Sequence, residues 1–117
     1  MSLLFRPHHL RAIRDGEKTV TRRDWAENYG RPTVGSVQMA VSEMFTTDEE
    51  CDCYIRIEAV YRESLGDMGE ADADAEGGYS LAEFRDEWRE INGDDSWDEE
   101  RTVDVVEFEY VGETRPA

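Results

Sequence analysis

The apolar residues of this chain lie in short segments, and their spacing changes from that of a strand to that of a helix and back. Residues 53–61 alternate apolar and polar side chains, the period of two that a half-buried strand requires. Leu81, Phe84, Trp88 and Ile91 recur at the three- and four-residue intervals of an amphipathic helix. Four or five strands and two main helices in mixed order within 117 residues predict one α+β domain, a small mixed β-barrel with two helices packed around it.

Turn and capping residues predict where these elements end. Pro7 suits the first turn of a helix, and Gly16 ends that helix. Ser80 is a candidate N-cap, and Glu83 completes a capping box. Val106 interrupts the alternation of the last strand, which predicts a β-bulge there. We expect strands at residues 3–5, 18–22, 36–45, 53–61 and 101–111, a helix at 7–15 and another after residue 80, and loops at 24–35 and 62–79.

Acidic residues dominate the charge of the chain. It holds 29 acidic and 13 basic residues, a net charge of −16, and only one of the basic residues is a lysine. Dense carboxylates with almost no lysine are typical of proteins that stay hydrated in a high-salt cytosol. We therefore predict a halophilic, acidic protein whose charge mainly solvates its surface. Because its hydrophobic residues, 38% of the total, are clustered, we expect a folded chain rather than an acidic tail.

Cysteine content and hydropathy indicate the cellular compartment of the protein. The two cysteines, Cys51 and Cys53, are too few for a disulfide scaffold and indicate a reducing interior. No apolar run approaches the length of a membrane span, and residues 1–6 do not resemble a signal peptide. We therefore expect a cytoplasmic protein without a membrane partner.

Basic residues are concentrated in the N-terminal third. Residues 1–35 carry seven basic and four acidic side chains, whereas residues 36–117 carry six basic and twenty-five acidic ones. A local excess of cations in so acidic a chain indicates an anionic ligand. The alternative is structural, because arginines that form salt bridges to the many carboxylates would give the same pattern.

Lys18, the only lysine, is followed within five residues by two threonines and two arginines. On an extended strand Lys18 and Arg22 share one face, and Thr19, Thr21 and Arg23 share the other. A twist or bend would bring Lys18 and Thr21 into one pocket. The alternative is an exposed basic strand without special chemistry.

The pattern Gly16-x-Lys18-Thr19-x-Thr21-x-Arg23 resembles the N-terminal signature of the ASCH domain family. A hydrophobic strand entered at residue 35, the stretch EGGYSLAEF at 76–84 and the closing strand at 105–108 resemble the family in order and spacing. The resemblance covers residues 3–112 and implies that residues 1–117 form one PUA-like β-barrel with a lysine, a threonine and an arginine in a cleft. It also implies a partner of the RNA or modified-nucleoside class.

Some small ASCH proteins resemble amidohydrolases that remove the acetyl group of N4-acetylcytidine with a lysine, a threonine and a glutamate. The resemblance carries the lysine to Lys18 and the threonine to Thr21. When the helix start at residues 80–84 is aligned with the family, the position of the family's glutamate falls on Gly77. A shift of one residue in the preceding loop moves that position to Glu76. Other members are linked to RNA cleavage, so the domain alone does not fix the reaction.

The implied chemistry is consistent with the neighbouring charges. Cations near Lys18 would lower its pKa, and the neutral amine could then accept the Thr21 proton to make a nucleophile. Glu76 could donate a proton to the leaving amine or orient a water. Alternatively, the same residues only bind phosphate or carboxylate. Trp25 or Tyr29 could stack a base. The candidate ligand-binding residues are Arg14, Lys18, Thr19, Thr21, Arg22, Arg23 and Trp25.

Three functions therefore stay open. The first is binding of RNA or of a small nucleoside or nucleotide in a basic cleft. The second is deacylation of N4-acetylcytidine. The third is a regulatory module whose acidic face binds a basic protein. Affinity for long RNA that falls steeply with salt would favour the first, and turnover of the free acylated nucleoside would favour the second.

A calcium-loop pattern is present but weak. Asp72, Asp74 and Glu76, followed by Gly77 and later by Glu83, nearly match its spacing. Glu76 is the wrong residue for the fifth place of the loop, and with 29 acidic residues such a match arises easily.

A zinc site is also weakly indicated. His8 and His9 could combine with Cys51 and Cys53, but adjacent histidines should point apart on a helix. The cysteines should instead share one face of a strand and pack inward. We therefore expect neither a metal nor another cofactor.

Overall fold

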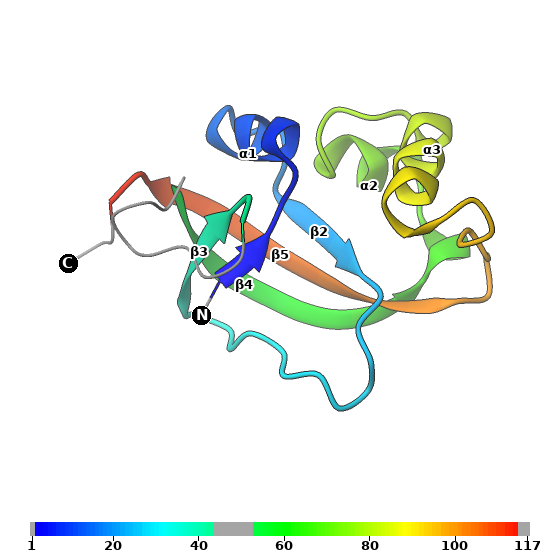
Figure 1. Ribbon diagram of the computed structural model, residues 1–117, viewed down its shortest axis with the longest axis horizontal. Helices are drawn as coiled ribbons and strands as arrows, with labels where there is room; N and C mark the ends of the chain where they lie inside the picture. The colour runs from blue at the N-terminus through cyan, green and yellow to red at the C-terminus, as the bar shows by residue number, and fades with distance from the viewer. Residues whose placement is uncertain (1, 44–52, 115–117) are drawn as a thin grey trace.

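The structure is a computed structural model that describes residues 2–43 and 53–114 (Figure 1). Its helices lie over one side of a sheet, and two long strands run side by side across the molecule. In chain order the elements are β1 (Ser2–Leu4), α1 (Pro7–Arg14), β2 (Val20–Arg23), β3 (Val37–Val41), β4 (Cys53–Ser64), a 3-10 turn (Leu65–Asp67), α2 (Glu70–Ala75), α3 (Leu81–Asn92) and β5 (Thr102–Gly112).

The strands form one sheet in the order β1-β3-β4-β5-β2. β1 pairs with β3 in parallel, and the other neighbouring pairs are antiparallel. This mixed sheet confirms the predicted α+β class. The predicted closure into a barrel is wrong, because the sheet of the described residues is open, with β1 and β2 at its edges. The segment before β2 bonds to the end of α2 instead of a further strand: Thr19 N donates to the Ala75 carbonyl oxygen (2.8 Å), and Lys18 forms an isolated bridge with Glu76.

Local sequence signals begin and end α1 and begin α3 as predicted. Pro7 occupies the first turn of α1, and Gly16 follows the helix in the left-handed conformation (φ 79°) that favours glycine. At α3, Ser80 Oγ accepts a hydrogen bond from Glu83 N (3.2 Å). The Glu83 carboxylate accepts one from Ser80 N (2.9 Å), which confirms the capping box.

Several predicted elements differ in extent: β1 and β2 are shifted by one or two residues, at Ser2–Leu4 and Val20–Arg23, and α1 ends one residue earlier, at Arg14. The predicted loop over 62–79 is partly wrong, because β4 continues to residue 64 and α2 forms at Glu70–Ala75. Asp72 caps this short helix by accepting a hydrogen bond from Gly69 N (2.9 Å), and alanines, the best helix formers, alternate with its acidic residues. β3 is shorter than the predicted strand at 36–45, of which residues 44 and 45 lie outside the described residues.

The predicted bulge at Val106 is misplaced. Ile57 pairs with Phe108 and Ala59 pairs with Glu107, so the extra residue is Glu58 on β4. The alternation of β5 is interrupted for another reason, since residues 103–106 are all buried and both faces of this inner strand are covered.

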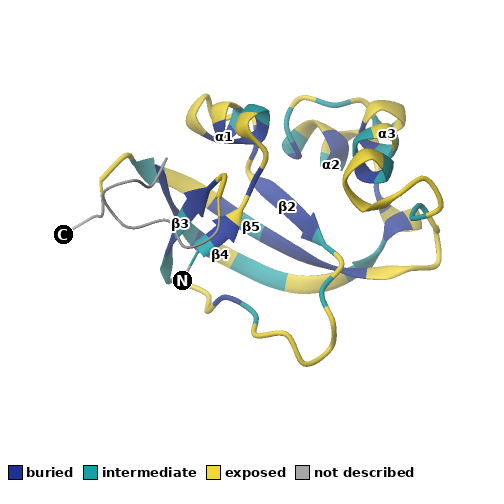
Figure 2. Ribbon diagram, viewed as in Figure 1, coloured by how far each residue is buried: buried dark blue, intermediate teal, exposed yellow. Residues whose placement is uncertain are grey.

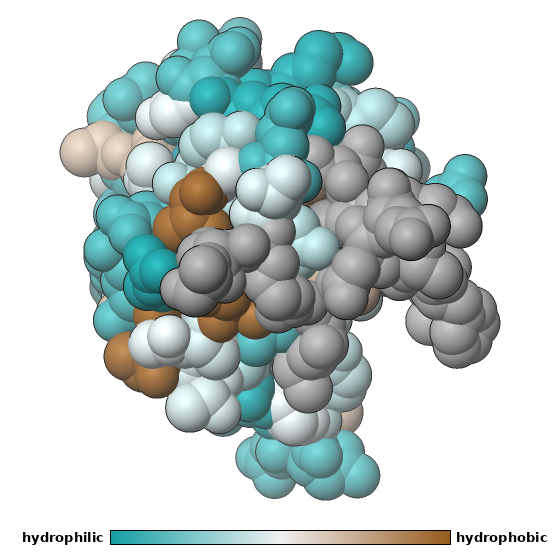
Figure 3. Space-filling model, turned by 90° about the vertical axis from the view of Figure 1, so that its left-hand side faces the viewer, coloured by the Kyte–Doolittle hydropathy of each residue, from teal (hydrophilic) through white to brown (hydrophobic). Residues whose placement is uncertain are grey.

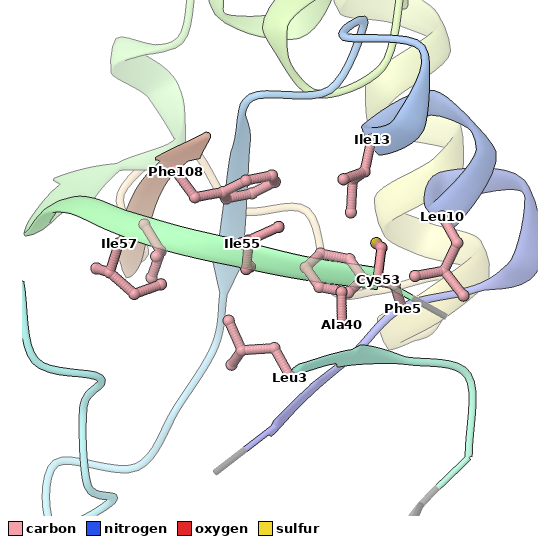
Figure 4. Packing of buried hydrophobic residues seen from close by; sticks show 10 residues of the cluster. Leu3, Phe5, Leu10, Ile13, Ala40, Cys53, Ile55, Ile57 and Phe108 are labelled. Atoms are coloured by element: carbon pink, nitrogen blue, oxygen red, sulfur yellow. The ribbon is translucent and has the colours of Figure 1, made fainter. Parts of the chain in front are cut away.

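Two apolar clusters hold the layers together. In the first, Leu10 and Ile13 of α1 approach Ile55 and Phe108 of the sheet (Figure 4). The sides of the helices that face the sheet are the buried ones (Figure 2). The second cluster joins α2 and α3 to the 3-10 turn and β5, and consists of Leu65, Met68, Ala73, Phe84, Trp88 and Val103.

The surface bears on the predicted partners. Within the described residues, no helix combines the length and the hydropathy needed to cross a membrane. The face shown in Figure 3 is mostly hydrophilic, with a few separate apolar patches. The large apolar side chains that are exposed come from different elements: Leu4, Tyr29, Val34, Tyr61, Ile91 and Tyr110.

Candidate functional site

A cavity of about 460 Å³ lies where α1, β2 and α3 meet. This volume is within the range of small-molecule sites. Phe5 of the first apolar cluster and Phe84 and Trp88 of the second form part of its wall. The polar side chains considered below that line it are His9, Lys18, Thr21, Arg22, Arg23, Glu76 and Glu87.

A buried group of three charged residues lies on one side of the cavity. Lys18 Nζ donates to Glu76 Oε1 (3.0 Å) and to the Glu76 carbonyl oxygen (2.9 Å). Arg22 donates to Glu76 Oε2 (2.8 Å) and to Glu63 Oε1 (2.9 Å). Lys18, Arg22 and Glu76 are only 3%, 6% and 2% exposed. Each charge therefore has a partner of opposite sign, as buried charges require.

Burial and the neighbouring carboxylates act in opposite directions on the two cations. Burial lowers the pKa of Lys18 below its usual 10.5, and Glu76 opposes this shift. Burial also acts to lower the pKa of Arg22, but Glu76 and Glu63 raise it overall. Arg22 is therefore a fixed cation, and Lys18 is the cation of the pair that can lose its proton more easily.

Thr21 lies beside a third cation. Its Oγ accepts a hydrogen bond from Arg23 Nε (3.0 Å), and the same guanidinium donates to the Leu4 carbonyl oxygen (2.6 Å). The Arg23 guanidinium also lies over the Phe5 ring, 4.8 Å from its centroid. Burial lowers the pKa of Arg23, and Glu76 opposes this. Among the described residues Arg23 forms no ion pair, so its charge is available to polarise the Thr21 hydroxyl or a ligand.

A bend before β2 brings Lys18 and Thr21 to the same cavity. Lys18 N donates to the carbonyl oxygen of Ala12, at the end of α1 (3.1 Å), and regular pairing of β2 with β5 begins only at Val20. Lys18 is therefore outside the strand alternation that would place it opposite Thr21.

Two of the candidate ligand-binding residues lie elsewhere. Thr19 is exposed and lines a separate hollow of about 210 Å³. Arg14 lies on the solvent side of α1 beside Glu113, with 3.4 Å between Nε and Oε1. Of the two positions considered for the glutamate, Glu76 lines the cavity. Gly77 has no side chain and turns the chain between α2 and α3 (φ 142°).

Trp25 lines the cavity, and Tyr29 packs against it. Their ring centroids are 5.0 Å apart at an interplanar angle of 34°. Arg31 orders this loop, because it donates to the Ala26 and Glu27 carbonyl oxygens (2.8 and 2.9 Å) and forms an ion pair with buried Asp104 (2.8 Å). Trp25 is therefore positioned to contact a planar ligand.

Sequence reasoning did not place two polar residues, His9 and Glu87, at the cavity. His9 Nε2 lies 2.9 Å from the Tyr79 hydroxyl and 3.7 Å from Glu87 Oε1. Burial, with help from the Lys18 charge, lowers the pKa of His9 to about 3, so its imidazole is neutral at ordinary pH. Burial and Glu87 raise the pKa of Tyr79 to about 12. The position of His9 four residues before Ile13, on the buried side of α1, was the one available signal.

Three of the four acidic residues of the calcium-loop pattern have separate structural roles. Asp72 caps α2, Glu83 caps α3 and Glu76 pairs with Lys18 and Arg22. Cys53 is buried, and Cys51 lies outside the described residues.

No protein-family profile and no curated protein sequence matches the chain. Among solved structures, an ASCH domain from Lactobacillus crispatus superimposes with a TM-score of 0.71 and 21% identity over 88% of this chain and 70% of its own. A DUF984 protein from Enterococcus faecalis superimposes with a TM-score of 0.61 and 18% identity, over 88% of this chain and 66% of its own. A point mutant of an ASCH protein from Zymomonas mobilis superimposes with a TM-score of 0.61 and 14% identity, over 92% of this chain and 67% of its own. The chain therefore has the ASCH-like, PUA-like fold.

Proposed function

We propose that the cavity binds a small acylated nucleoside of the N4-acetylcytidine type and hydrolyses the amide on its base. The observation that carries this proposal is that Lys18, Thr21 and Glu76 line one cavity, with Lys18 and Glu76 joined at 3.0 Å. These are the three residue types of the amidohydrolases that the sequence resembles. A cavity of about 460 Å³ is large enough for a nucleoside.

The distribution of ion pairs favours a small ligand over long RNA. Much of the positive charge of residues 1–35 is balanced within the protein: Lys18 and Arg22 by Glu76, and Arg31 by Asp104. Cations that already have partners release few counterions from a polyphosphate, so they contribute little affinity for it.

In the proposed reaction Thr21 Oγ attacks the acyl carbon of the substrate. Its proton passes to the neutral amine of Lys18, whose charged form is disfavoured by burial. Lys18 can reach this neutral form by passing its own proton to Glu76 Oε1, 3.0 Å away. The carbon–nitrogen bond then breaks, the leaving amine of the base takes up a proton from Lys18, and an ester forms on Thr21. Water attacks this ester, which releases the carboxylic acid and restores the hydroxyl.

Arg23 has the geometry to stabilise charge that develops at Thr21. Its Nε is 3.0 Å from Thr21 Oγ, and it keeps a positive charge throughout. A cation held next to the reacting oxygen in a buried site needs no reorganisation during the reaction.

The test is release of cytidine from N4-acetylcytidine, measured by chromatography at high salt for the parent and for paired threonine variants. Thr21→Val should abolish turnover, because it removes the nucleophile while keeping a branched side chain. Thr19→Val, two residues away but outside the cavity, should keep it. Lys18→Arg should also be inactive, because arginine does not give up its proton at the assay pH. The hydrolase proposal fails if the parent shows no turnover, or if Thr21→Val is as active as Thr19→Val.

A second candidate is binding of cytidine or a modified nucleoside without turnover. It is favoured by the Glu76 carboxylate, which accepts a hydrogen bond from Lys18 and opposes the lowering of the Lys18 pKa by burial. Calorimetry with cytidine would then show binding that Arg23→Ala weakens, while the acylated nucleoside stays intact. Equal binding by the parent and Arg23→Ala would contradict this candidate.

A further inference from the structure

Three side chains with metal-binding atoms meet beside the cavity. His8 and His9 lie in the first turn of α1, and Glu87 lies on α3. Glu87 Oε1 is 3.1 Å from His8 Nε2 and 3.7 Å from His9 Nε2. One ligand atom from each residue lies within 4.8 Å of the other two. The expectation that adjacent histidines point apart is wrong here, because both imidazoles turn toward α3 and their ring centroids are 4.3 Å apart.

We propose that His8, His9 and Glu87 bind one divalent transition-metal ion of the zinc class. Two imidazole nitrogens with one carboxylate are typical ligands of zinc and its neighbours, whereas calcium and magnesium prefer oxygen alone. Bond lengths of about 2.0–2.1 Å place the ligand atoms of a tetrahedral site roughly 3.4 Å apart. The separations of 3.1 and 3.7 Å from Glu87 lie on either side of that value, and the ligand atoms of the two histidines lie within 4.8 Å of each other, so side-chain rotations would have to complete the site.

The hydrogen bonds around the three residues suit this role. His9 Nε2 faces the hydroxyl of Tyr79 at 2.9 Å, so it can present a lone pair. The charge of the Glu87 carboxylate also acts on Tyr79 and raises the pKa of its hydroxyl. A metal ion would replace the hydroxyl at His9 Nε2, which would free the Tyr79 proton to be donated to the Glu87 carboxylate. Partners of this kind orient the ligands of metal sites.

Charge makes Glu87 the decisive ligand. The cations Lys18, Arg23 and Arg6 act on His9 and would oppose a further positive ion. Lys18 is already paired with Glu76, and the only negative charge among the three ligands comes from Glu87. Loss of this carboxylate should therefore weaken metal binding more than loss of the half-exposed His8 imidazole.

The proposed site is separate from the hydrolytic residues but adjoins them. His9 and Glu87 line the same cavity as Lys18 and Thr21, so an ion held there would border the ligand. It would also link α1 to α3. Three protein ligands leave at least one coordination position for water or substrate, as in catalytic zinc sites.

The test is a titration of the metal-free protein with Co²⁺, followed by its visible absorption, in an excess of Mg²⁺ that saturates the surface carboxylates. We expect one equivalent to bind with the intense absorption of a four-coordinate ion and to be displaced by Zn²⁺. His8→Ala should weaken binding by at least about tenfold, and Glu87→Gln by more. Glu90→Gln is the matched control, because Glu90 is an exposed carboxylate on the same helix. It should bind as the parent does.

Two results would overturn the metal site. The first is no stoichiometric binding of Co²⁺ or Zn²⁺ in the presence of Mg²⁺. The second is binding that Glu87→Gln and Glu90→Gln change equally, which would mean adventitious binding by surface carboxylates. Circular dichroism of each variant shows whether it is folded. Because the readout is metal absorption, this test can fail while cytidine release succeeds, and the reverse.

Discussion

Replacing Glu76 by glutamine should be among the most destabilising single changes in this protein. The substitution keeps the shape of the side chain but removes the negative charge that Lys18 Nζ and Arg22 approach at 3.0 and 2.8 Å. Removing one partner of a buried ion pair costs about 3–5 kcal/mol, because the remaining charge stays buried without compensation. At the usual stability per residue, 117 residues correspond to a total of roughly 6–18 kcal/mol, so the loss is a large part of the whole.

An exposed pair provides the matched control. Arg56 Nη1 and Glu109 Oε1 are 2.9 Å apart, a distance between those of the two buried pairs, but their side chains are 41% and 52% exposed. Pairs of this kind contribute about 0–1 kcal/mol, so Glu109→Gln should change stability little. Urea denaturation of the parent and both variants, followed by circular dichroism, measures the difference. If Glu76→Gln costs no more than Glu109→Gln, the cluster at the cavity is not a buried ion-pair network.

A double-mutant cycle separates the Lys18–Glu76 interaction from other effects of the substitutions. Lys18→Met leaves Glu76 with Arg22, and the double variant leaves Arg22 with Glu63. The double variant should therefore lose less than the sum of the single losses, with a coupling of about 0.5–3 kcal/mol. Additive losses would show that the two residues do not interact in solution.

Three further predictions use other features. The melting temperature should be higher above about 1 M salt than at 0.1 M, because the shorter Debye length, about 3 Å instead of about 10 Å, means that salt screens the carboxylate repulsion. A flat or falling melting temperature would contradict the halophilic prediction. Turnover of N4-acetylcytidine should rise with pH and level off below 10.5, because burial lowers the pKa of Lys18 and the base must be neutral; a rise that continues beyond pH 10.5 would argue against this base. Ser80→Ala should cost about 1 kcal/mol in urea denaturation through loss of the α3 cap, and an unchanged midpoint would show that this bond contributes nothing.

The elements that could be predicted from the sequence are those with a strong local signal. The capping box at Ser80 and the strand after Cys53 depend on neighbouring residues, and both appear in the structure. The predicted alternation holds only in part, because Tyr54 is buried and, beyond the bulge at Glu58, Tyr61 is exposed. The helix α2 was missed because its acidic residues and flanking glycines resemble a loop, and its cap at Gly69 uses a backbone N–H rather than a typical N-cap side chain. The open sheet was not predictable from strand periods, since closure depends on what covers the edge of β2.

The candidate site depends on contacts between distant residues. Lys18 and Thr21 could be proposed together from a local pattern, but the choice between Glu76 and Gly77 depends on the length of one loop. The ion pair that decides it joins residues 58 positions apart. The contact between His8 and Glu87 spans 79 positions. No periodicity within either helix reveals such a contact, because it results from how α1 and α3 pack on the sheet.

The most direct test of the proposed function is a crystal structure of the Thr21→Val variant soaked with N4-acetylcytidine at high salt. The substitution should prevent turnover, so the intact substrate can be seen. We predict that it lies in the cavity, with its acyl carbon beside the side chain at position 21 at about the 3–3.5 Å of a near-attack arrangement and its base near Trp25. A nucleoside bound in the hollow beside Thr19, or one whose acyl group points away from position 21, would contradict the proposed hydrolysis.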